Sequence, residues 1–366
     1  MQIKNYLACL FFAGSTYNMY AQDTTKTKPE FKPSGKLWGY VFGDYYYKLH
    51  ADSLNRGAGE YSAMNENSNA FEFRRVYLGY DYNISEKFSA ELLLSHEKNY
   101  DASANRTVFI KAANVRWKNI LPKNDLIIGQ SSTPTWSFVS EKMWGYRSVE
   151  KTVTDMHKAG SSNDIGIALQ GKLDSAGNFG YNLMLGNGTG SKIENDVFKK
   201  MYGEVYVKLF KQKLILDFYA DFERKQLKPY RKDYSTYKIF LAYQAKRFII
   251  GAEAYYQFQD YIPYDENTDK EIIGTSLFAK AVIIKDKLNF FVRNDMYIPD
   301  MIMLSTGYKS SETFQTAGLD YTPNKNIHII PNIWNSSYYT ENPALPVKIR
   351  RDNDLVVRIT IYYIFK

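Results

Sequence analysis

The segment DLVVRITIYYIF, residues 354–365, alternates between two kinds of side chain. Its apolar set is Leu355, Val357, Ile359, Ile361, Tyr363 and Phe365. The intervening set includes Asp354, Arg358, Thr360 and Tyr362. A period of two puts these sets on opposite faces of a β-strand, whereas a helix would mix them. The segment therefore predicts a strand with one apolar face and one face turned toward water.

The same pattern recurs from residue 35 onward, in segments of about ten residues bounded by turn-forming residues. In residues 214–223 the apolar set is Leu214, Leu216, Phe218, Ala220 and Phe222. In residues 248–258 it is Phe248, Ile250, Ala252, Ala254, Tyr256 and Phe258. Repeated segments of this kind are typical of a transmembrane antiparallel β-barrel, in which lipid-facing residues occupy every second position. We expect an all-β fold of this class.

The connections between these segments alternate in length. The short ones are 85–87, 121–124, 174–178, 211–213, 245–247, 285–287 and 323–325. The long, polar ones are 52–69, 97–106, 137–163, 188–199, 225–233, 259–270, 299–311 and 341–348. Bacterial barrels have short periplasmic turns and longer outer loops. Seven short turns and eight long loops predict about 16 strands, with both termini on the periplasmic side.

The composition narrows the alternatives. The 366 residues are 45% hydrophobic, 16% aromatic and 23% charged with one Cys, so the chain is neither disordered nor a disulfide-stapled miniprotein. Mean hydropathy is -0.43, and no run approaches the roughly 18 apolar residues of a membrane helix. The net charge of +8 is scattered, which argues against nucleic-acid binding. A soluble β-sandwich or propeller is the alternative fold, although the apolar faces often end in aromatic residues, as a membrane girdle would.

The N-terminal residues predict export. Residues 1–21 have the pattern of a signal peptide, with Lys4, a modest apolar stretch over residues 6–14 and Ala21 at the expected cleavage point. Residues 22–34, with Pro29 and Pro33, are expected to form a periplasmic tail, and residues 35–366 the barrel. The expected location is the outer membrane of a Gram-negative bacterium.

The longest connection, residues 137–163, is the third outer loop in this count, and general porins fold their third outer loop into the barrel. It has four basic and three acidic side chains, a mixture that suits a transverse field across a constriction. The candidate constriction residues are Glu141, Lys142, Trp144, Arg147, Glu150 and Lys151. A solvated surface loop is the alternative.

Charged residues on the faces opposite the apolar sets are expected to line the interior, since each would cost about 2–4 kcal/mol at the lipid midplane. The candidates are Arg75, Glu91, Arg116, Asp217, Glu253, Arg293, Asp295 and Arg358. The face of Arg116 is ambiguous, because Phe109, Ala113, Val115 and Trp117 share their parity with Lys111. The alternative role for these charges is a network of ion pairs that only stiffens the wall.

Signals for catalysis or cofactors are weak. The four histidines have no metal-ligand spacing, and no G-x-S-x-G motif occurs. The segment GNGTGSK, residues 186–192, lacks the adjacent Gly-Lys pair of a phosphate-binding loop and is expected to be a flexible loop. We expect no metal, no cofactor and no enzymatic activity; a hydrolase in the barrel is the minority alternative.

Three stretches resemble the phosphate-selective porin O and P family of Gram-negative outer membranes. They are residues 71–94, FEFRRVYLGYDYNISEKFSAELLL; residues 126–152, LIIGQSSTPTWSFVSEKMWGYRSVEKT; and residues 163–190, which include NDIGIALQGKL and FGYNLMLGNGTG. The matching features are Arg74 and Arg75, Gly129 and Gln130, Thr133 and Pro134, and Trp144 with Arg147 and Ser148. The resemblance implies a sixteen-strand barrel, a homotrimer, and conduction of small anionic or neutral solutes, phosphate among them.

The function expected from the sequence is therefore a porin: a water-filled channel for passive diffusion, with membrane lipid and small solutes or inorganic anions as its partners. A barrel with a closed interior that binds surfaces through its outer loops is the alternative from a different class.

Overall fold

The computed structural model describes residues 30–98, 100, 102–227, 230–262, 269–302, 308–342, 347 and 349–365. The predicted signal peptide and most of the predicted tail lie outside the described residues. The first strand begins at Ser34, one residue before the predicted start of the barrel.

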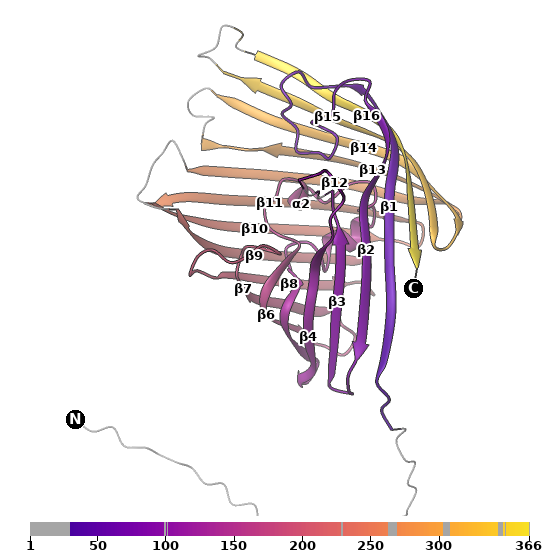
Figure 1. Ribbon diagram of the computed structural model, residues 1–366, viewed down its shortest axis with the longest axis vertical. Coiled ribbons are helices and arrows are strands. Elements are labelled where there is room, and N and C mark those ends of the chain that lie inside the picture. Colours follow the sequence, from indigo (N-terminus) through magenta and orange to yellow (C-terminus); the bar gives the residue numbers. More distant parts are fainter. Residues whose placement is uncertain are drawn as a thin grey trace, which may run out of the picture. The chain divides into compact units, whose positions relative to one another are not determined.

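Sixteen strands and two short helices make up the described fold (Figure 1). The first eight strands are β1 Ser34–His50, β2 Asn69–Asn83, β3 Phe88–His96, β4 Phe109–Leu121, β5 Asn124–Ser132, β6 Asn163–Lys172, β7 Phe179–Gly186 and β8 Lys200–Leu209. The others are β9 Leu214–Leu227, β10 Tyr230–Gln244, β11 Phe248–Ile262, β12 Lys270–Ile284, β13 Leu288–Ile298, β14 Lys309–Asn324, β15 Ile327–Glu341 and β16 Ile349–Phe365. The helices, α1 Ser140–Trp144 and α2 Val153–Met156, lie between β5 and β6. Within the described residues, no helix is long and apolar enough to cross a membrane.

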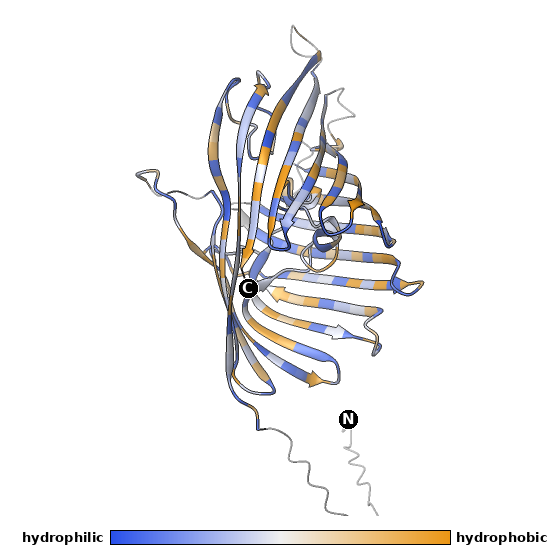
Figure 2. Ribbon diagram, turned by 90° about the vertical axis from the view of Figure 1, so that its right-hand side faces the viewer, coloured by the Kyte–Doolittle hydropathy of each residue, from blue (hydrophilic) through white to orange (hydrophobic). Residues whose placement is uncertain are grey.

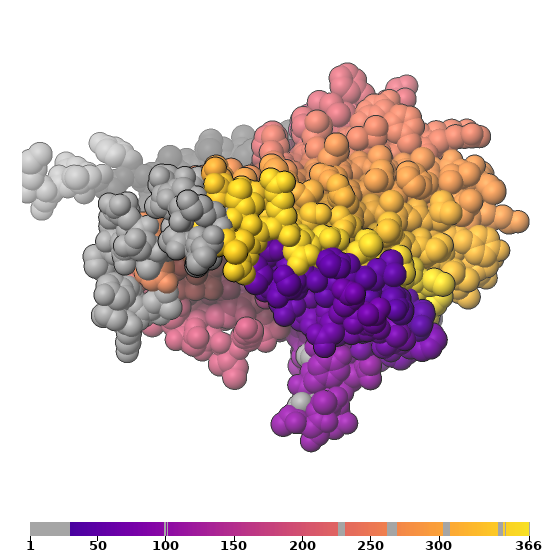
Figure 3. Space-filling model, turned by 90° about the horizontal axis from the view of Figure 1, so that it is seen from above, coloured from indigo at the N-terminus to yellow at the C-terminus, as the bar shows by residue number. Residues whose placement is uncertain are grey.

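Each strand pairs antiparallel with its neighbours in sequence, and β1 pairs with β16 to close the barrel. At this seam Gly39 lies opposite Phe365 and Tyr46 lies opposite Arg358. Figure 3 shows the indigo N-terminal part and the yellow C-terminal part of the barrel wall side by side. Closure leaves no free sheet edge, which a membrane requires because lipid cannot satisfy unpaired backbone groups. The predicted sixteen-strand antiparallel barrel is confirmed.

The alternation of side chains is also confirmed. On β16, Asp354, Arg358 and Thr360 are buried inside the barrel, whereas Ile359 and Ile361 are exposed on its outer face. Bands of opposite hydropathy alternate along the strands in Figure 2. Aromatic pairs occur near both ends of the outer face, including Phe88–Trp117 and Tyr243–Phe248 at the short turns and Tyr45–Phe71 at the other end. An apolar outer face of this kind is stable in lipid and unfavourable in water.

The predicted loop at residues 225–233 is much shorter than expected. Residues 225–233 were expected to be an outer loop, but β9 continues to Leu227 and β10 begins at Tyr230. Across these strands the Arg224 Nε atom lies 3.1 Å from the Asp233 Oδ1 atom. Cross-strand charge pairs let a polar hairpin continue the sheet. The polar composition that suggested a loop therefore belongs to an extended hairpin.

Candidate functional site: the barrel interior and its inward loop

The connection between β5 and β6, residues 133–162, folds into the barrel, as predicted for the third outer loop. We call this segment the inward loop. Its first helix, α1, ends at Gly145, which has a left-handed φ of 70° that glycine adopts without a steric penalty. The second helix, α2, begins after Thr152, whose side chain accepts a hydrogen bond from the Asp155 backbone N–H. Gly145 and Thr152 thus set the ends of the two helices through local backbone geometry and capping.

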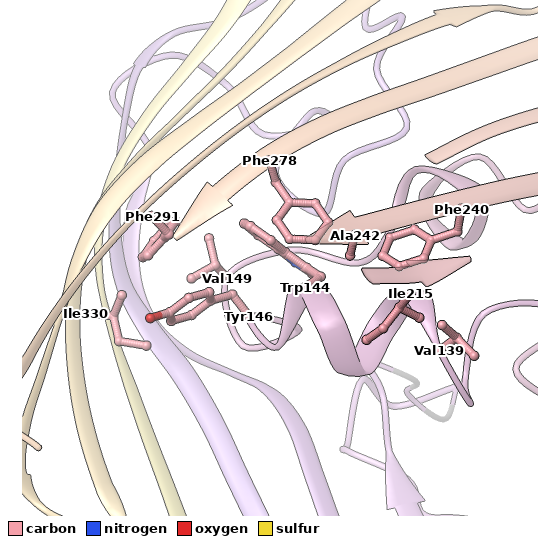
Figure 4. Packing of buried hydrophobic residues seen from close by; sticks show 10 residues of the cluster. All are labelled: Val139, Trp144, Tyr146, Val149, Ile215, Phe240, Ala242, Phe278, Phe291 and Ile330. Atoms are coloured by element: carbon pink, nitrogen blue, oxygen red, sulfur yellow. The ribbon is translucent and has the colours of Figure 1, made fainter. Parts of the chain in front are cut away.

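An apolar cluster joins the inward loop to the barrel wall (Figure 4). The loop contributes Val139, Trp144, Tyr146 and Val149, and the wall contributes Ile215, Phe240, Ala242, Phe278, Phe291 and Ile330. The Trp144 ring lies edge-on to Phe278 and Phe291, with centroids 5.3 and 5.9 Å apart. Burying an aromatic ring of this size stabilises the contact by several kcal/mol, roughly 3–5 on the scale of aromatic truncations. The cluster therefore fixes the loop against β9, β10, β12, β13 and β15.

Three buried arginines of the wall hold the loop's backbone. Arg358 on β16 donates to the Val149 carbonyl oxygen at 2.6 Å, and Arg293 on β13 donates to the Lys151 carbonyl oxygen. Arg74 on β2 donates to the Ser148 carbonyl oxygen. Each guanidinium also faces a carboxylate, Asp295 for Arg293 and Asp44 for the other two. These charge-assisted hydrogen bonds are about twice as strong as neutral ones, so they set the loop's position.

The six predicted constriction residues fall into two groups. Trp144 and Glu150 are buried where the loop meets the wall, and the Glu150 carboxylate accepts a hydrogen bond from Trp334 Nε1 at 3.2 Å. They pack the loop against the wall. The other four, Glu141, Lys142, Arg147 and Lys151, keep some exposure, and Lys142 is the most exposed of the set.

Arg147 sits in a compact ion cluster. It pairs with Glu141 in α1 and with Asp155 in α2, the latter at 2.6 Å, and so joins the two helices of the loop. Burial raises the pKa of Glu141 more than the Arg147 charge lowers it. Arg147 therefore links α1 to α2 and stabilises the inward loop.

All eight predicted lumen residues lie on the inner face, although most are paired there. Asp217 pairs with Lys238 at 2.8 Å, Glu253 accepts a hydrogen bond from Thr154 of the inward loop, and Glu91 accepts one from Asn114 at 3.0 Å. Arg293 pairs with Asp295, and Arg358 donates to the inward loop. Arg75 pairs with Glu60, and Arg116 pairs with Asp125.

The ambiguous parity of Arg116 is resolved by a β-bulge. Leu93 lies opposite Ala112 and Leu94 opposite Ile110, so Lys111 is the extra residue in β4. A bulge reverses the alternation beyond it. Lys111 and Arg116 therefore both reach the interior.

Arg74 is a wall residue that strict alternation misses. Phe42 lies opposite Arg75 and Gly43 opposite Phe73, so Arg74 bulges out of register and its side chain turns inward with that of Arg75. Its exposed fraction is only 1%. Two consecutive arginines in an otherwise alternating strand were the available signal, because one of them would have faced lipid in a regular strand.

The first outer loop, between β1 and β2, also folds inward, which the sequence did not predict. Tyr61 is 1% exposed and donates to Asp44 at 2.6 Å, while Glu60 lies between Arg75 and Arg74 at 2.6 and 3.2 Å. Burial raises the pKa of Glu60, but the charges of Arg75, Arg74, Lys151 and Lys98 outweigh it and hold that pKa well below its usual range. Lys151 Nζ lies 3.7 Å from Glu60, so the first loop touches the inward loop.

A water-accessible recess of about 920 Å³ lies inside the barrel on the side of the short turns. Its wall comes from residues beside the turns after β4, β6, β8 and β10, and the inward loop closes it from above. The cationic lining residues are Arg116, Lys118, Lys123, Lys142, Lys172 and Lys208, and the acidic ones are Asp125 and Asp174. We call this space the turn-side recess.

The glycine-rich segment after β7 contacts a carboxylate of the chain itself. The backbone N–H groups of Gly188 and Gly190 donate to Asp164 at 2.7 and 3.2 Å, and Tyr202 donates to the same side chain at 2.8 Å. The N–H groups of these two glycines therefore already have a carboxylate acceptor within the chain. Across the described part of the chain, no group of three or more His, Cys, Asp and Glu side chains is placed to hold a metal ion.

Solved structures with the same fold are outer-membrane proteins. The outer membrane channel DcaP of Acinetobacter baumannii superposes with a TM-score of 0.68 at 14% identity, over 92% of this chain and 99% of that one. The anion-selective porin from Comamonas acidovorans gives 0.64 at 13%, over 91% and 100%. OmpT of Vibrio cholerae, an outer membrane protein solved in a trimer form, gives 0.60 at 11%, over 91% and 99%.

At these identities the similarity shows the fold. No protein-family model matches the chain, and no curated protein sequence matches it. Membership of the phosphate-selective porin O and P family therefore stays a prediction. The closed barrel with its apolar outer face is the architecture of a Gram-negative outer-membrane protein.

Proposed function

We propose that this protein is an outer-membrane channel through which small solutes diffuse passively. The observation that carries the proposal is the turn-side recess, a charged, water-accessible space inside a closed sixteen-strand barrel and directly beneath the inward loop. A sixteen-strand barrel is wide enough to leave an aqueous channel, and an inward loop narrows it. The porins with the same fold support this proposal.

The charges beside the recess favour anions. Six cationic side chains and two carboxylates line it, which attracts small anions and repels small cations. Anionic and neutral solutes are therefore the proposed cargo, with inorganic phosphate as one candidate. Transport by diffusion makes and breaks no bond, so no catalytic residue is required.

A liposome-swelling assay tests this proposal. Protein-containing liposomes should swell in isotonic solutions of small neutral solutes and small anions, and the rate should fall steeply as solute size increases. A matched variant with residues 137–160 replaced by a short Gly-Ser linker should swell faster with larger solutes, because the inward loop is gone. Equal rates with and without the loop would contradict its role as the constriction.

A second candidate has its own support. The first outer loop and the inward loop both pack inside the barrel, with Tyr61, Trp144 and Val149 almost fully buried. A barrel filled in this way could serve as a surface-binding protein that does not conduct. Liposomes that contain folded protein and do not swell in any solute would favour this candidate.

We further propose a homotrimer, the form described for OmpT of Vibrio cholerae. Native mass spectrometry of the detergent-solubilised protein tests this state. A single peak at the monomer mass would overturn it.

A further inference from the structure

The turn-side recess has six cationic side chains and few carboxylates to pair with them. Arg116 pairs with Asp125 at 3.0 Å. Among the described residues, no carboxylate lies within ion-pairing distance of the ammonium groups of Lys118, Lys123, Lys142, Lys172 or Lys208. Charges of one sign gathered in a concave site with low-dielectric walls concentrate ions of the opposite sign.

The cations on the opposite side of the inward loop have carboxylate partners. There Arg75 pairs with Glu60 at 2.6 Å, Lys111 pairs with Glu97, and Arg147 pairs with two carboxylates. The five lysines of the turn-side recess differ from these cations in having no carboxylate partner among the described residues.

One wall of the recess is apolar. It is formed by Phe138, Val139, Met143, Tyr206 and Ile215. Val139 and Ile215 belong to the buried cluster of the inward loop, and the other three pack against it. This wall is therefore held by the same contacts that fix the loop, and it presents a preformed apolar surface to a ligand.

Two cations are held at the edge of that wall. Lys142 Nζ lies 5.5 Å from the centre of the Phe138 ring, and Lys208 Nζ lies 5.5 Å from the centre of the Tyr206 ring. Cation–π contacts of this kind orient an ammonium group without neutralising it. Each of the two lysines thus stands directly beside apolar surface.

We propose that the turn-side recess binds small organic anions that combine one carboxylate with an apolar body. The carboxylate would meet Lys142 and Lys208, and the apolar body would lie on Phe138, Met143 and Tyr206. The recess measures about 920 Å³, within the range of small-molecule sites. This inference rests on the proposed channel function and specifies a class of solute for it.

Calorimetric titration of the full-length protein in detergent tests the inference. Benzoate is the probe, benzyl alcohol is its neutral counterpart, and inorganic phosphate is an anion without an apolar body. Benzoate should bind most tightly, because only benzoate uses both parts of the site. Binding of benzyl alcohol as tight as that of benzoate, or tighter binding of phosphate, would overturn the proposed ligand class.

A pair of double variants locates the site. Lys142→Gln with Lys208→Gln should weaken benzoate binding about tenfold or more, because two charge-assisted contacts are lost. Lys285→Gln with Lys287→Gln removes the same charge from an exposed turn and should leave binding unchanged. Equal effects of the two variants would show that net charge, rather than the recess, determines binding.

The same preparations separate this inference from the channel proposal. Single-channel recordings in potassium chloride report conduction, and added benzoate should reduce the current in proportion to its binding. A protein that conducts but does not bind benzoate would refute the inference alone. A protein that binds benzoate but does not conduct would refute the channel proposal alone.

Discussion

The Arg358 guanidinium on the last strand donates to the Val149 carbonyl oxygen in the inward loop at 2.6 Å, across 209 positions of sequence. β16 closes the barrel by pairing with β1, so this contact forms only in the closed barrel. Arg74 and Arg293 make the equivalent contacts from β2 and β13. The seating of the loop is therefore coupled to the completion of the wall.

Replacing Arg358 should loosen the loop without opening the barrel. Arg358→Gln removes a buried hydrogen bond from a charged donor, worth about 1.5–3 kcal/mol. Backbone amides of residues 146–152 should then exchange with solvent roughly 10- to 100-fold faster in hydrogen-exchange mass spectrometry. Arg351→Gln, on the same strand but exposed, is the matched control. Unchanged exchange in Arg358→Gln would show that this contact does not hold the loop.

Trp144 should be the main apolar anchor. Trp144→Ala leaves a cavity between the loop and Phe278 and Phe291, at a cost of about 3–5 kcal/mol. The loop should then fluctuate, and single-channel current should become larger and noisier. Trp117→Ala removes a Trp from the outer face of the barrel and should leave the current unchanged. Conduction by Trp144→Ala equal to that of the unaltered protein would contradict the role of the inward loop as the constriction.

Arg147 and Lys142 should respond differently to substitution. Arg147→Gln leaves Glu141 and Asp155 without their shared cation, which typically costs about 3–5 kcal/mol, so it should destabilise the loop. Lys142→Glu changes an exposed charge in the recess and should shift the reversal potential in a salt gradient toward cations. These different roles would be contradicted if both variants shifted the reversal potential equally and both left the loop as stable as in the unaltered protein.

The inward loop should lose stability in acid through His157. Burial and the charge of Arg293 lower the pKa of His157 to about 3, against about 6.5 in an unfolded chain. The seated loop thus binds fewer protons than the released loop between these values. Its stability is complete above about pH 6.5 and falls as the pH decreases through this window.

At pH 5, which is roughly 1.5 units below the unfolded pKa, the seated loop should lose about 2 kcal/mol of stability, because each unit corresponds to about 1.4 kcal/mol. Hydrogen exchange of residues 153–160, corrected for intrinsic rates, should show that loss relative to pH 7 in the unaltered protein. His157→Gln should remove most of it. The same pH response in both proteins would place the titrating group elsewhere.

The barrel could be predicted from sequence because its signals are local. Alternation on segments such as residues 355–365 identifies a strand and its apolar face, and short turns mark one end of the barrel. The sixteen strands and their antiparallel order follow from these signals, whereas the inward fold of the third loop was expected by analogy with general porins.

The site could be predicted only in part, because side-chain roles depend on contacts between distant strands. Glu150 and Trp144 have the polarity and the size expected at a constriction, yet they meet Trp334 and Phe278 and become buried. The inward course of the first loop depends on Tyr61 reaching Asp44 and on Glu60 reaching Arg75. No spacing in the sequence predicts these contacts between the first loop and the wall.

The bulges at Arg74 and Lys111 explain why Arg74 was missed and why the parity of Arg116 was ambiguous. Each inserts one residue and brings two consecutive side chains inside the barrel. A count by twos cannot detect that shift, although a charge out of phase with its strand is a usable warning.

Single-channel recording of the purified, folded protein in a planar bilayer under a salt gradient tests the channel function most directly. We predict stable stepwise currents and a reversal potential that favours anions. Protein shown to be folded by its β-sheet circular dichroism, inserted in the bilayer and yet electrically silent would contradict the channel function.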